Sequence, residues 1–483
     1  MLEARNITFS YDGTTLVLES LSFQVKRGEI VAITGSTGSG KSTLAKCLSG
    51  FIPRNVQGDF SGLVLIDDSD IAELQIAEVA RQVVLVQQDP ESQICTLQVS
   101  DEVAFGPENY GTEVEEISAL VDSSLKSVGS EHLYNRATFE LSGGEKQRLI
   151  IASMTACRPD FLILDEPSSS LDPRGVLQLR QILRDLQNQN IGVIVIEHNL
   201  PAIQPVADRI LVLTNGRIQP LSASEQQIPT QISRRTPDGS DPPLVTVKNL
   251  EFSYGNRKVI DNVTLGLQRG EIVGLMGSNG SGKTTLLGLL GGLLAPDSGI
   301  ISFNNSPLGR MNAKEIAHQI STVFQNPNHQ IFEKTVWNEQ ILTLKALELD
   351  TSDMFEHCQI TLERAGLAGL HERNPFSLSH GQKRRLNVSS IIVHSPKVLL
   401  LDEPFIGQDV DGREFIKETV METVERGGTA LIVTHDSRFV LDYCSRAVFM
   451  ENGSILLDGS PSSIFERLEN IGYREYADLG VQP

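Results

Sequence analysis

KRGEIVAITGSTGSGKST, at residues 26–43, decides the fold, because it joins a short apolar run to a glycine-rich loop and the start of a helical pattern. Residues 35–42 fit the pattern G-x-x-x-x-G-K-[ST]. Glycines let the backbone wrap closely around a phosphate, and the amides at the start of the helix point toward the anion. The stretch therefore predicts a phosphate-binding loop between a strand and a helix of an α/β domain.

The same pattern returns as QRGEIVGLMGSNGSGKTT at residues 268–285. The later landmarks keep their order, and three pairs are each 237 positions apart: Gln88 and Gln325, Asp165 and Asp402, and His198 and His435. A length of 483 residues suggests about three domains at roughly 150 residues each. The repeat instead predicts two copies of one larger domain.

The predicted domains cover residues 1–219 and 244–483. Between them, residues 220–243 hold five prolines and many small polar residues, a composition typical of a semi-extended linker. Within the first copy, FLILD and GVIVIEH are apolar runs rich in β-branched residues, as in buried strands. The segment between Gln88 and Ser142 lacks this pattern and is mostly helical, so we expect a helical subdomain inserted in each α/β core.

Both loops end in a lysine followed by a hydroxyl residue. Lys41 and Lys283 can reach the β and γ phosphates of a nucleotide, while Ser42 and Thr284 can bind Mg²⁺. A chance glycine-rich turn is the alternative, but each match follows a strand and opens a helix, as the motif requires. The predicted nucleotide-binding residues are Gly35, Ser36, Thr37, Gly38, Ser39, Gly40, Lys41, Ser42 and Thr43 in the first loop, and Gly277, Ser278, Asn279, Gly280, Ser281, Gly282, Lys283, Thr284 and Thr285 in the second.

Acidic pairs end two of the buried apolar runs, Asp165 with Glu166 and Asp402 with Glu403. The aspartate can hold Mg²⁺, directly or through water, and the glutamate can orient or deprotonate the attacking water. Asp-Glu-Pro after an apolar run is also common where a strand meets a turn. Because each pair is in register with a phosphate loop, we predict two metal-binding aspartates and two catalytic glutamates.

A third motif lies between each loop and its acidic pair, LSGGEKQR at 141–148 and LSHGQKRR at 378–385. The first resembles the signature motif of ATP-binding-cassette (ABC) ATPases, and the resemblance covers nearly the whole chain, twice. It implies two tandem P-loop ABC ATPase domains with RecA-like α/β cores that bind ATP and Mg²⁺. The further roles that it implies are adenine stacking by Tyr11 and Tyr254, Mg²⁺ sensing and a link to a membrane partner by Gln88 and Gln325, γ-phosphate contacts by His198 and His435, and D-loops at 169–172 and at Asp409.

Serine and glycine at a helix N-terminus form a second anion site. The resemblance therefore implies head-to-tail pairing of the two domains around ATP, within one chain because a linker raises effective concentration. Ser142, Gly143 and Gly144 would complete the site of the second loop, and Ser379, His380 and Gly381 that of the first. His380 replaces the first signature glycine, so we expect two hydrolysing sites that need not be equal.

The segments QDPESQI at 88–94 and QNPNHQIF at 325–332 are similar to the Q-N-P-x-x-Q-[IL]-F stretch of energy-coupling factor (ECF) transporter ATPases. VAFGPEN at 103–109 and RNPF at 373–376 resemble other strings of that family, whereas the second half reads VWNEQI at 336–341. The resemblance implies an ATPase that drives uptake of a vitamin or a metal ion, with a T-type transmembrane subunit and a small S-type substrate-binding subunit. Thiamine or its hydroxymethylpyrimidine precursor is the substrate it suggests.

Two alternatives stay open, a fused ATPase of a sugar importer and a soluble ABC ATPase that acts on ribosomes or DNA. The chain has 61 acidic residues against 41 Lys and Arg, a net charge of −20. This excess argues against nucleic acid as a main partner. No apolar run approaches the roughly 20 residues of a spanning helix. We therefore expect a soluble chain held peripherally at the cytoplasmic face of the cell membrane by another subunit.

Four basic residues extend the two signature motifs, Arg148 in the first and Lys383, Arg384 and Arg385 in the second. A solvated helix face is the simplest interpretation of these charges.

Overall fold

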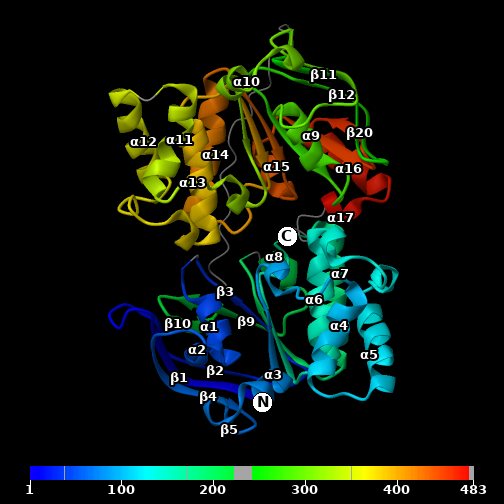
Figure 1. Cartoon of the computed structure of the whole chain (residues 1–483), viewed down its shortest axis with the longest axis vertical. Coiled ribbons are helices and arrows are strands. Elements are labelled where there is room, and N and C mark those ends of the chain that lie inside the picture. Colours follow the sequence, from blue (N-terminus) through cyan, green and yellow to red (C-terminus); the bar gives the residue numbers. More distant parts are fainter. Residues whose placement is uncertain (37, 170, 199, 222–241, 350, 478–483) are drawn as a thin grey trace. The chain divides into compact units, whose positions relative to one another are not determined.

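The computed structural model describes residues 1–36, 38–169, 171–198, 200–221, 242–349 and 351–477. The chain divides into two compact units, whose described residues are 1–221 and 242–477. Most of the expected linker, residues 222–241, lies outside the described residues. The strands follow the same order in both units, with helices between them, so the chain is an α/β protein with two tandem domains (Figure 1).

The first unit contains two sheets. An antiparallel sheet has the order β2-β1-β4-β5, and a second sheet has the order β10-β9-β3-β8-β7-β6, parallel except at β10. Every residue of β6, β7 and β8 is buried, which is typical of parallel strands covered on both faces. The strands predicted from the sequence are confirmed. The strands are β1 (Leu2–Ser10), β2 (Leu16–Val25), β3 (Ile30–Thr34), β4 (Asp59–Ile66), β5 (Ser69–Asp70), β6 (Val83–Val86), β7 (Phe161–Asp165), β8 (Gly192–Ile196), β9 (Arg209–Thr214) and β10 (Arg217–Pro220).

Three helices of the first unit, α4, α5 and α6, pack together as a separate subdomain (Figure 1). The chain between Gln88 and Ser142 contributes α4 and α5 to it and no strand to either sheet, which confirms the predicted helical insertion. The helices are α1 (Lys41–Leu48), α2 (Phe51–Arg54), α3 (Ile76–Gln82), α4 (Val99–Asn109), α5 (Val114–Ser127), α6 (Gly143–Ala156), α7 (Pro173–Asn188) and α8 (Leu200–Ile203).

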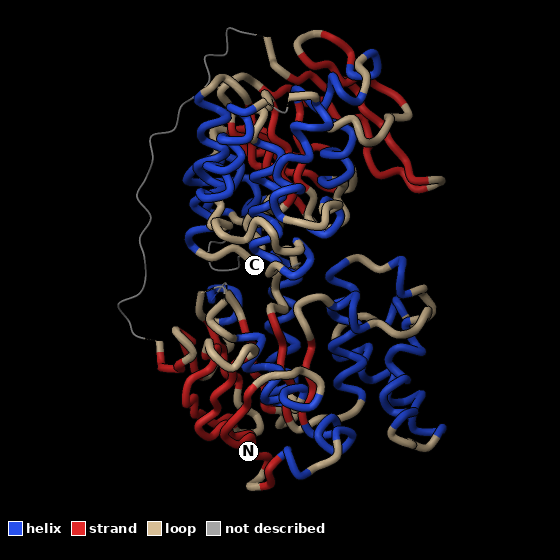
Figure 2. The backbone as a smooth tube through the Cα atoms, turned by 60° about the vertical axis from the view of Figure 1, so that its left-hand side comes forward, coloured by secondary structure: helices blue, strands red, loops and turns tan. Residues whose placement is uncertain are grey.

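The second unit repeats this plan with sheets of order β12-β11-β14-β15 and β16-β17-β18-β13-β19-β20. In the first unit a group of helices with their loops lies beside the region that holds the strands (Figure 2). The strands are β11 (Val245–Tyr254), β12 (Arg257–Leu267), β13 (Ile272–Gly277), β14 (Ser298–Phe303), β15 (Ser306–Pro307), β16 (Ile320–Val323), β17 (Val398–Asp402), β18 (Thr429–Val433), β19 (Arg446–Glu451) and β20 (Ser454–Gly459). The helices are α9 (Lys283–Leu290), α10 (Ala313–Gln319), α11 (Val336–Leu347), α12 (Ser352–Arg364), α13 (His380–Ile392), α14 (Val410–Glu425), α15 (Ser437–Tyr443), α16 (Pro461–Asn470) and α17 (Arg474–Ala477).

The parallel strands place the predicted site residues at one edge of each sheet. In the first unit the phosphate loop follows β3, Gln88 follows β6, Asp165 ends β7 and His198 follows β8. Carboxyl ends of parallel strands meet at the same edge, where open α/β sheets bind their ligands. Side chains far apart in the sequence are therefore gathered there by the strand order alone.

No helix in the described ranges combines the length and the apolar character that crossing a bilayer requires.

Candidate active sites

The phosphate loop of each unit is held by its own lysine. Lys41, the first residue of α1, donates from Nζ to the carbonyl oxygens of Gly35 and Ser36, both at 2.9 Å. Lys283 makes the equivalent two bonds in the second loop, at 2.9 and 2.8 Å. The two lysines are only 5% and 7% exposed. The two loops therefore share one internal geometry.

Glycine is required at the start of each loop because the neighbouring strand lies so close. A Cβ on Gly35 would lie 2.2 Å from the carbonyl oxygen of Leu213 in β9, and one on Gly277 would lie 2.1 Å from that of Met450 in β19. Both glycines also have positive φ, +156° and +145°. The loops can pass against these strands only without a side chain.

Of the site residues predicted from the sequence, Thr37 and Ser170 of the D-loop lie outside the described residues. Two loop hydroxyls, Ser39 Oγ and Ser281 Oγ, are buried and have no hydrogen-bond partner among the described residues. Donors of this kind at a helix N-terminus suit an anionic ligand.

The aspartates at the ends of β7 and β17 lie beside the loop hydroxyls. Thr284 Oγ1 donates to Asp402 Oδ2 at 2.7 Å. Burial raises the pKa of Asp165 to about 6, although a hydrogen bond from Ser42 and the charge of Lys41 act in the opposite direction. Burial likewise raises the pKa of Asp402. Burial makes the ionised form of these carboxylates unfavourable on its own. A bound cation would stabilise that ionised form.

The two predicted catalytic glutamates have left-handed backbone conformations, with φ of +51° at Glu166 and +46° at Glu403. Such conformations cost about 1–3 kcal/mol for residues other than glycine and cluster at active sites. The backbone amide of Glu166 donates to Ile196 and that of Glu403 to Val433, so each is fixed against the neighbouring strand. Burial raises the pKa of the Glu403 carboxyl.

Each glutamate contacts the histidine of its own unit that is predicted to contact the γ phosphate. His198 Nε2 lies 3.0 Å from Glu166 Oε1, and His435 Nε2 lies 3.4 Å from Glu403 Oε1. In the first unit Gln88 Nε2 also donates to Glu166 Oε2 at 2.6 Å. Residues separated by as many as 110 positions therefore form one constellation, as the strand order requires.

The predicted adenine-stacking tyrosines are accessible, and Tyr11 lies next to its phosphate loop. The hydroxyls of Tyr11 and Thr43 are 3.0 Å apart, and the Tyr11 ring packs edge-on against Phe9. Tyr254 packs edge-on against Phe252 in the same way. The two tyrosines are 49% and 54% exposed, so their ring surface is available to a ligand.

The signature motifs form helix N-termini, as predicted. Ser142 caps α6, and its hydroxyl and backbone amide both donate to Glu145 Oε2 at 2.8 Å. Ser379 caps α13 with Gln382 in the place of the glutamate. Burial raises the pKa of Glu145, but hydrogen bonds from Ser142 and nearby arginines outweigh it, so the net shift is downward. The first signature therefore carries a carboxylate where the second has a neutral amide.

The replacement of glycine by His380 falls on the first residue of α13. The next position is tighter, because a Cβ on Gly381 would lie 2.7 Å from the carbonyl oxygen of Gly407. The helix thus accepts a side chain at the first position and packs closely at the second.

The interpretation of the basic residues as a solvated helix face is wrong for Arg384 and Arg385. Arg384 is completely buried, and Arg385 is 9% exposed with Nη1 2.9 Å from Asp409 Oδ1. Burial lowers the pKa of Arg384 to about 10, so it is still charged at neutral pH. Both side chains contact the protein because this face of α13 packs inward.

Two glutamines, Gln93 and Gln330, support the Gln88 loop (residues 88–94) and the Gln325 loop (residues 325–332) from within, although the sequence pattern assigned them no role. Gln93 accepts from the backbone amide of Gln87 at 2.7 Å and donates to the Leu85 carbonyl at 3.0 Å. Gln330 makes the equivalent bonds in the second unit, at 2.9 and 2.7 Å. In the sequence, a shared role of these two glutamines is indicated by their equal spacing from Gln88 and Gln325.

Two buried glutamates, Glu102 and Glu339, hydrogen-bond to the backbone that precedes their own helices, α4 and α11. Glu102 accepts from the amides of Cys95 and Thr96, and Glu339 accepts from two amides in the same way. Both are 2% exposed. No local pattern in the sequence distinguishes them from the solvated glutamates of a helix.

The residues present fit a magnesium ion with a nucleotide. Mg²⁺ prefers oxygen ligands and is usually held by one or two carboxylates together with substrate phosphates. Each unit brings a hydroxyl and a carboxylate together at the carboxyl edge of its sheet, with a Gln side chain following the adjacent strand. In the first unit the buried Oδ1 of Asp165 has no hydrogen-bond partner among the described residues.

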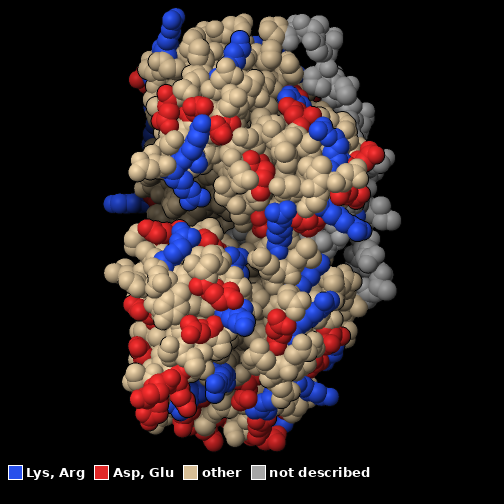
Figure 3. All heavy atoms as spheres, turned by 90° about the vertical axis from the view of Figure 1, so that its right-hand side faces the viewer, with Lys and Arg blue, Asp and Glu red and all other residues tan. Residues whose placement is uncertain are grey.

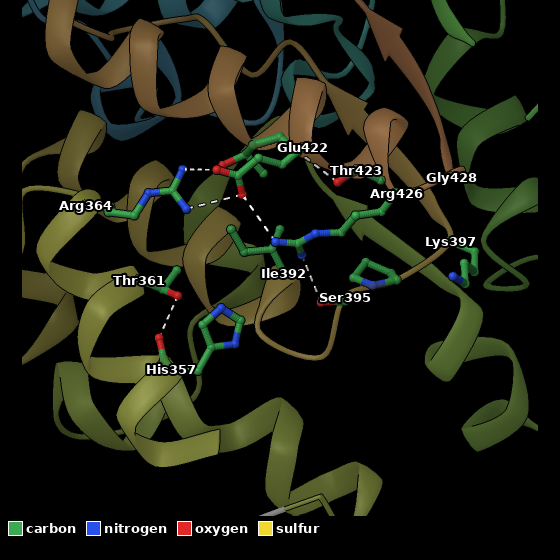
Figure 4. Close-up of a pocket in the computed structure, with 12 residues that line it drawn as sticks. His357, Thr361, Arg364, Ile392, Ser395, Lys397, Glu422, Thr423, Arg426 and Gly428 are labelled. Atoms are coloured by element: carbon green, nitrogen blue, oxygen red, sulfur yellow. Dashed lines mark hydrogen bonds and ion pairs between the residues drawn. The ribbon is translucent and has the colours of Figure 1, made fainter. Parts of the chain in front are cut away.

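A cavity of about 50 Å³ in the second unit is separate from these residues. There the Arg364 guanidinium on α12 donates to Glu422 on α14 at 2.6 and 3.2 Å, and Arg426 donates to Ser395 at 3.2 Å (Figure 4). These bonds join the helical subdomain to the core. The cavity contains no residue of the phosphate loop or of the acidic pair.

Basic and acidic side chains are interspersed on the face of the molecule shown in Figure 3. This face offers no extended basic surface of the kind that tracks a nucleic-acid backbone.

The family described as ABC transporter matches the chain at residues 18–169 and 260–406, once in each unit. A protein of Methanosarcina mazei, provisionally named an ABC transporter ATP-binding protein, is 33% identical over 96% of this chain and 90% of its own length. A protein of Bacillus subtilis, provisionally named the HMP/thiamine import ATP-binding protein YkoD, is 32% identical over 97% of this chain and 93% of its own.

A solved complex of an archaeal ribosomal stalk protein with the archaeal ribosome recycling factor aABCE1 is also similar. The superposition covers 97% of this chain and 92% of the similar chain in that complex, with a TM-score of 0.65 and 23% sequence identity. At this identity the similarity concerns the fold alone.

Proposed function

The chain belongs to the ABC transporter family, and we propose that it is the ATP-hydrolysing subunit of a membrane importer of the ECF type. Members of this family bind ATP with Mg²⁺. In this proposal the chain lies at the cytoplasmic face of the cell membrane, held by a T-type transmembrane subunit, while a small S-type subunit binds the imported substrate. Pairing of the two units around ATP, which the linker would favour, stays a prediction from the sequence.

The observation that carries hydrolysis is the repeated Glu–His pair at the edge of each parallel sheet, 3.0 Å apart in the first unit and 3.4 Å in the second. Ser42 with Asp165, and Thr284 with Asp402, would hold Mg²⁺, which neutralises charge on the β and γ phosphates when bound. Lys41 and Lys283 would bind the same phosphates.

The glutamate of each pair would orient the attacking water and accept its proton as the water oxygen bonds to the γ phosphorus. The bond from that phosphorus to the oxygen bridging to the β phosphate breaks, giving ADP and inorganic phosphate. In each pair the contact with the histidine holds the carboxylate of the glutamate in place. Catalysis here consists mainly of positioning and charge stabilisation, as in phosphoryl transfer generally.

Coupling to a membrane subunit is supported by exposed apolar side chains at the end of the Gln325 loop and just after the Gln88 loop. Leu97 and Phe332 are each 74% exposed, and Phe105 within the VAFGPEN segment of α4 is 46% exposed. Large exposed apolar residues that gather beside a functional loop favour a protein partner. Because α11 has Trp337 where α4 has Ser100, and Leu342 where α4 has Phe105, the two units would contact the partner differently.

The substrate that we propose is thiamine or its hydroxymethylpyrimidine precursor. It is supported by the name of the Bacillus subtilis relative, which is 32% identical over nearly the full length of both chains. A vitamin of another class, or a metal ion, would leave the rest of the proposal intact.

Hydrolysis at both sites is tested by replacing the glutamates one at a time. Glu166→Gln and Glu403→Gln keep size and hydrogen bonding but remove the acceptor for the proton. We expect each variant to lose part of the ATP turnover and the double variant to lose nearly all of it, with ATP binding retained. If one variant is inactive and the other turns over ATP at the wild-type rate, two-site hydrolysis is wrong.

Transport is tested by purifying the chain from detergent-solubilised membranes of cells that contain its natural partners. We expect two integral membrane proteins, one of them small, to co-purify in fixed proportion, and the small one to bind labelled thiamine or hydroxymethylpyrimidine. Recovery with ribosomes and without a membrane protein would overturn the proposal.

A further inference from the structure

The completely buried Arg384 spans the ends of two neighbouring strands. Its Nη1 donates to the carbonyl oxygens of Phe324 at 2.5 Å and Asp402 at 3.2 Å, and its Nη2 donates to that of Gln325. These carbonyls lie at the carboxyl ends of β16 and β17, which pair in parallel. One side chain of the signature helix α13 thus holds the base of the Gln325 loop against the strand that ends in Asp402.

Further polar side chains of α13 extend this contact. Asn387 Nδ2 donates to the carbonyl oxygen of Pro327 at 2.9 Å, and Lys383 Nζ donates to Asn328 Oδ1 at 3.0 Å. Arg384 and Asn387 are 0% and 1% exposed, so both bonds are shielded from water. Three side chains on one face of α13 therefore hold the Gln325 loop.

The same helix is fixed to α11 as well. Ser389 Oγ donates to Gln340 Oε1 at 2.6 Å, and the Gln340 amide donates to the Ser389 carbonyl at 3.3 Å. Both side chains are completely buried. The signature helix, the Gln325 loop and α11 form one hydrogen-bonded group.

The first unit lacks the two buried contacts. At the equivalent positions, 237 residues earlier, α6 has Gln147 and Ile150. Gln147 is buried, and its Nε2 has no hydrogen-bond partner within the described ranges. Lys146 does reach Glu91 at 2.9 Å, but that carboxylate side chain is 71% exposed. The braces from Gln93 and Gln330 are alike in both units. The backbone of the two loops therefore differs in the buried contacts, while the bond from Gln88 to Glu166 distinguishes the side chains.

We propose that Arg384, together with Asn387, is a positioning residue that presets the Gln325 loop and the Asp402 strand end for magnesium, while the Gln88 loop of the first unit adjusts on binding. A charged donor makes shorter and stronger bonds to carbonyls than a neutral amide. Its planar fork also fixes direction, so the loop cannot shift without breaking several bonds at once. This inference rests on the proposed ATP hydrolysis, and the first test below is independent of activity.

Hydrogen–deuterium exchange tests the positioning directly in the full chain. We expect the amides of residues 324–331 to exchange several-fold more slowly than those of 87–94, because buried side chains of α13 hold three carbonyls of the second loop. The bond from Gln88 to Glu166 in the first loop joins two side chains and holds no backbone group. Arg384→Gln, which introduces the residue of the first unit, should abolish this difference and leave 87–94 unchanged. Equal exchange of the two loops in the wild-type chain would overturn the proposal.

Magnesium dependence tests the functional consequence. In a Glu166→Gln background, where the second site is studied alone, Arg384→Gln should raise the half-saturating Mg²⁺ concentration by about tenfold, as expected when a group that supports a metal ligand is removed. ATP binding in the presence of a chelator should stay within twofold, and Arg384→Lys should have an intermediate effect. An unchanged Mg²⁺ dependence, or an equal loss of metal-free ATP binding, would contradict the proposal.

The matched control is Gln147→Leu in a Glu403→Gln background, which should leave the Mg²⁺ dependence of the first site unchanged. If the Arg384→Gln variant does not fold, the Asn387→Ile variant provides the same exchange test without removing a charge. A chain with the expected exchange difference but without ATPase activity would refute the proposed function and retain this inference.

Discussion

Gly35→Ala is expected to disable the first nucleotide site through a steric clash. The new Cβ would lie 2.2 Å from the Leu213 carbonyl oxygen. That oxygen belongs to β9, which is paired with β3 over four residues and with β10 on its other side. The strand is therefore held on both sides, and the phosphate loop is the part that must move.

The required movement sets the size of the effect. Ordinary van der Waals contact begins at 3.4 Å, so the loop must shift by about 1 Å. A displacement of about 1 Å in a group that positions a reacting substrate can cost on the order of 100-fold in rate. The strained backbone should also cost about 1–3 kcal/mol of stability. For a unit of this size, each kcal/mol lowers the melting temperature by about 2–4 °C.

The assay measures ATP turnover and melting temperature in a Glu403→Gln background, so that only the first site hydrolyses. Gly38→Ala is the matched control, because Gly38 also has positive φ, +81°, but a Cβ there would meet nothing within 4 Å. We expect Gly38→Ala to retain most of the turnover and Gly35→Ala to lose about 99% of it. Turnover of the two variants within threefold of each other would refute the steric argument.

Three more predictions follow from buried polar groups. Glu102→Met should destabilise the chain by about 1–3 kcal/mol for each buried amide left unpaired, because a thioether cannot replace the carboxylate as acceptor for Cys95 and Thr96; a change in chemical denaturation below experimental error would contradict this. Arg385→Met should destabilise it by about 1–3 kcal/mol, since the partly buried Asp409 loses this partner but keeps the bond from the Gly412 amide, and pairing the change with Asp409→Asn should recover part of the loss. Because the pKa of Asp165 is raised to about 6, protons compete with Mg²⁺ at acid pH, and the half-saturating free Mg²⁺ concentration of the first site should rise about fourfold from pH 7.5 to pH 5.5; a constant or falling value would show that this carboxylate does not bind the metal.

Much of the fold could be predicted because its determinants are local. The apolar run before Gly35 and the glycines that follow it specify a strand and a loop whatever the rest of the chain does. The repeat then fixed the number of domains, and the absence of strand pattern between Gln88 and Ser142 located the helical insertion. The site residues at strand ends followed, since parallel strands bring their carboxyl ends to one edge.

The sequence alone determined the two α/β domains, the phosphate loops and the identity of the groups that end the strands. Only the tertiary structure decided which charges are buried. Lys383, Arg384 and Arg385 are consecutive cations with the same local pattern, yet Arg384 is completely buried and Lys383 is partly exposed. The direction of each side chain depends on the face of α13 that packs against the Gln325 loop, and that packing is set by residues about 60 positions away in the chain.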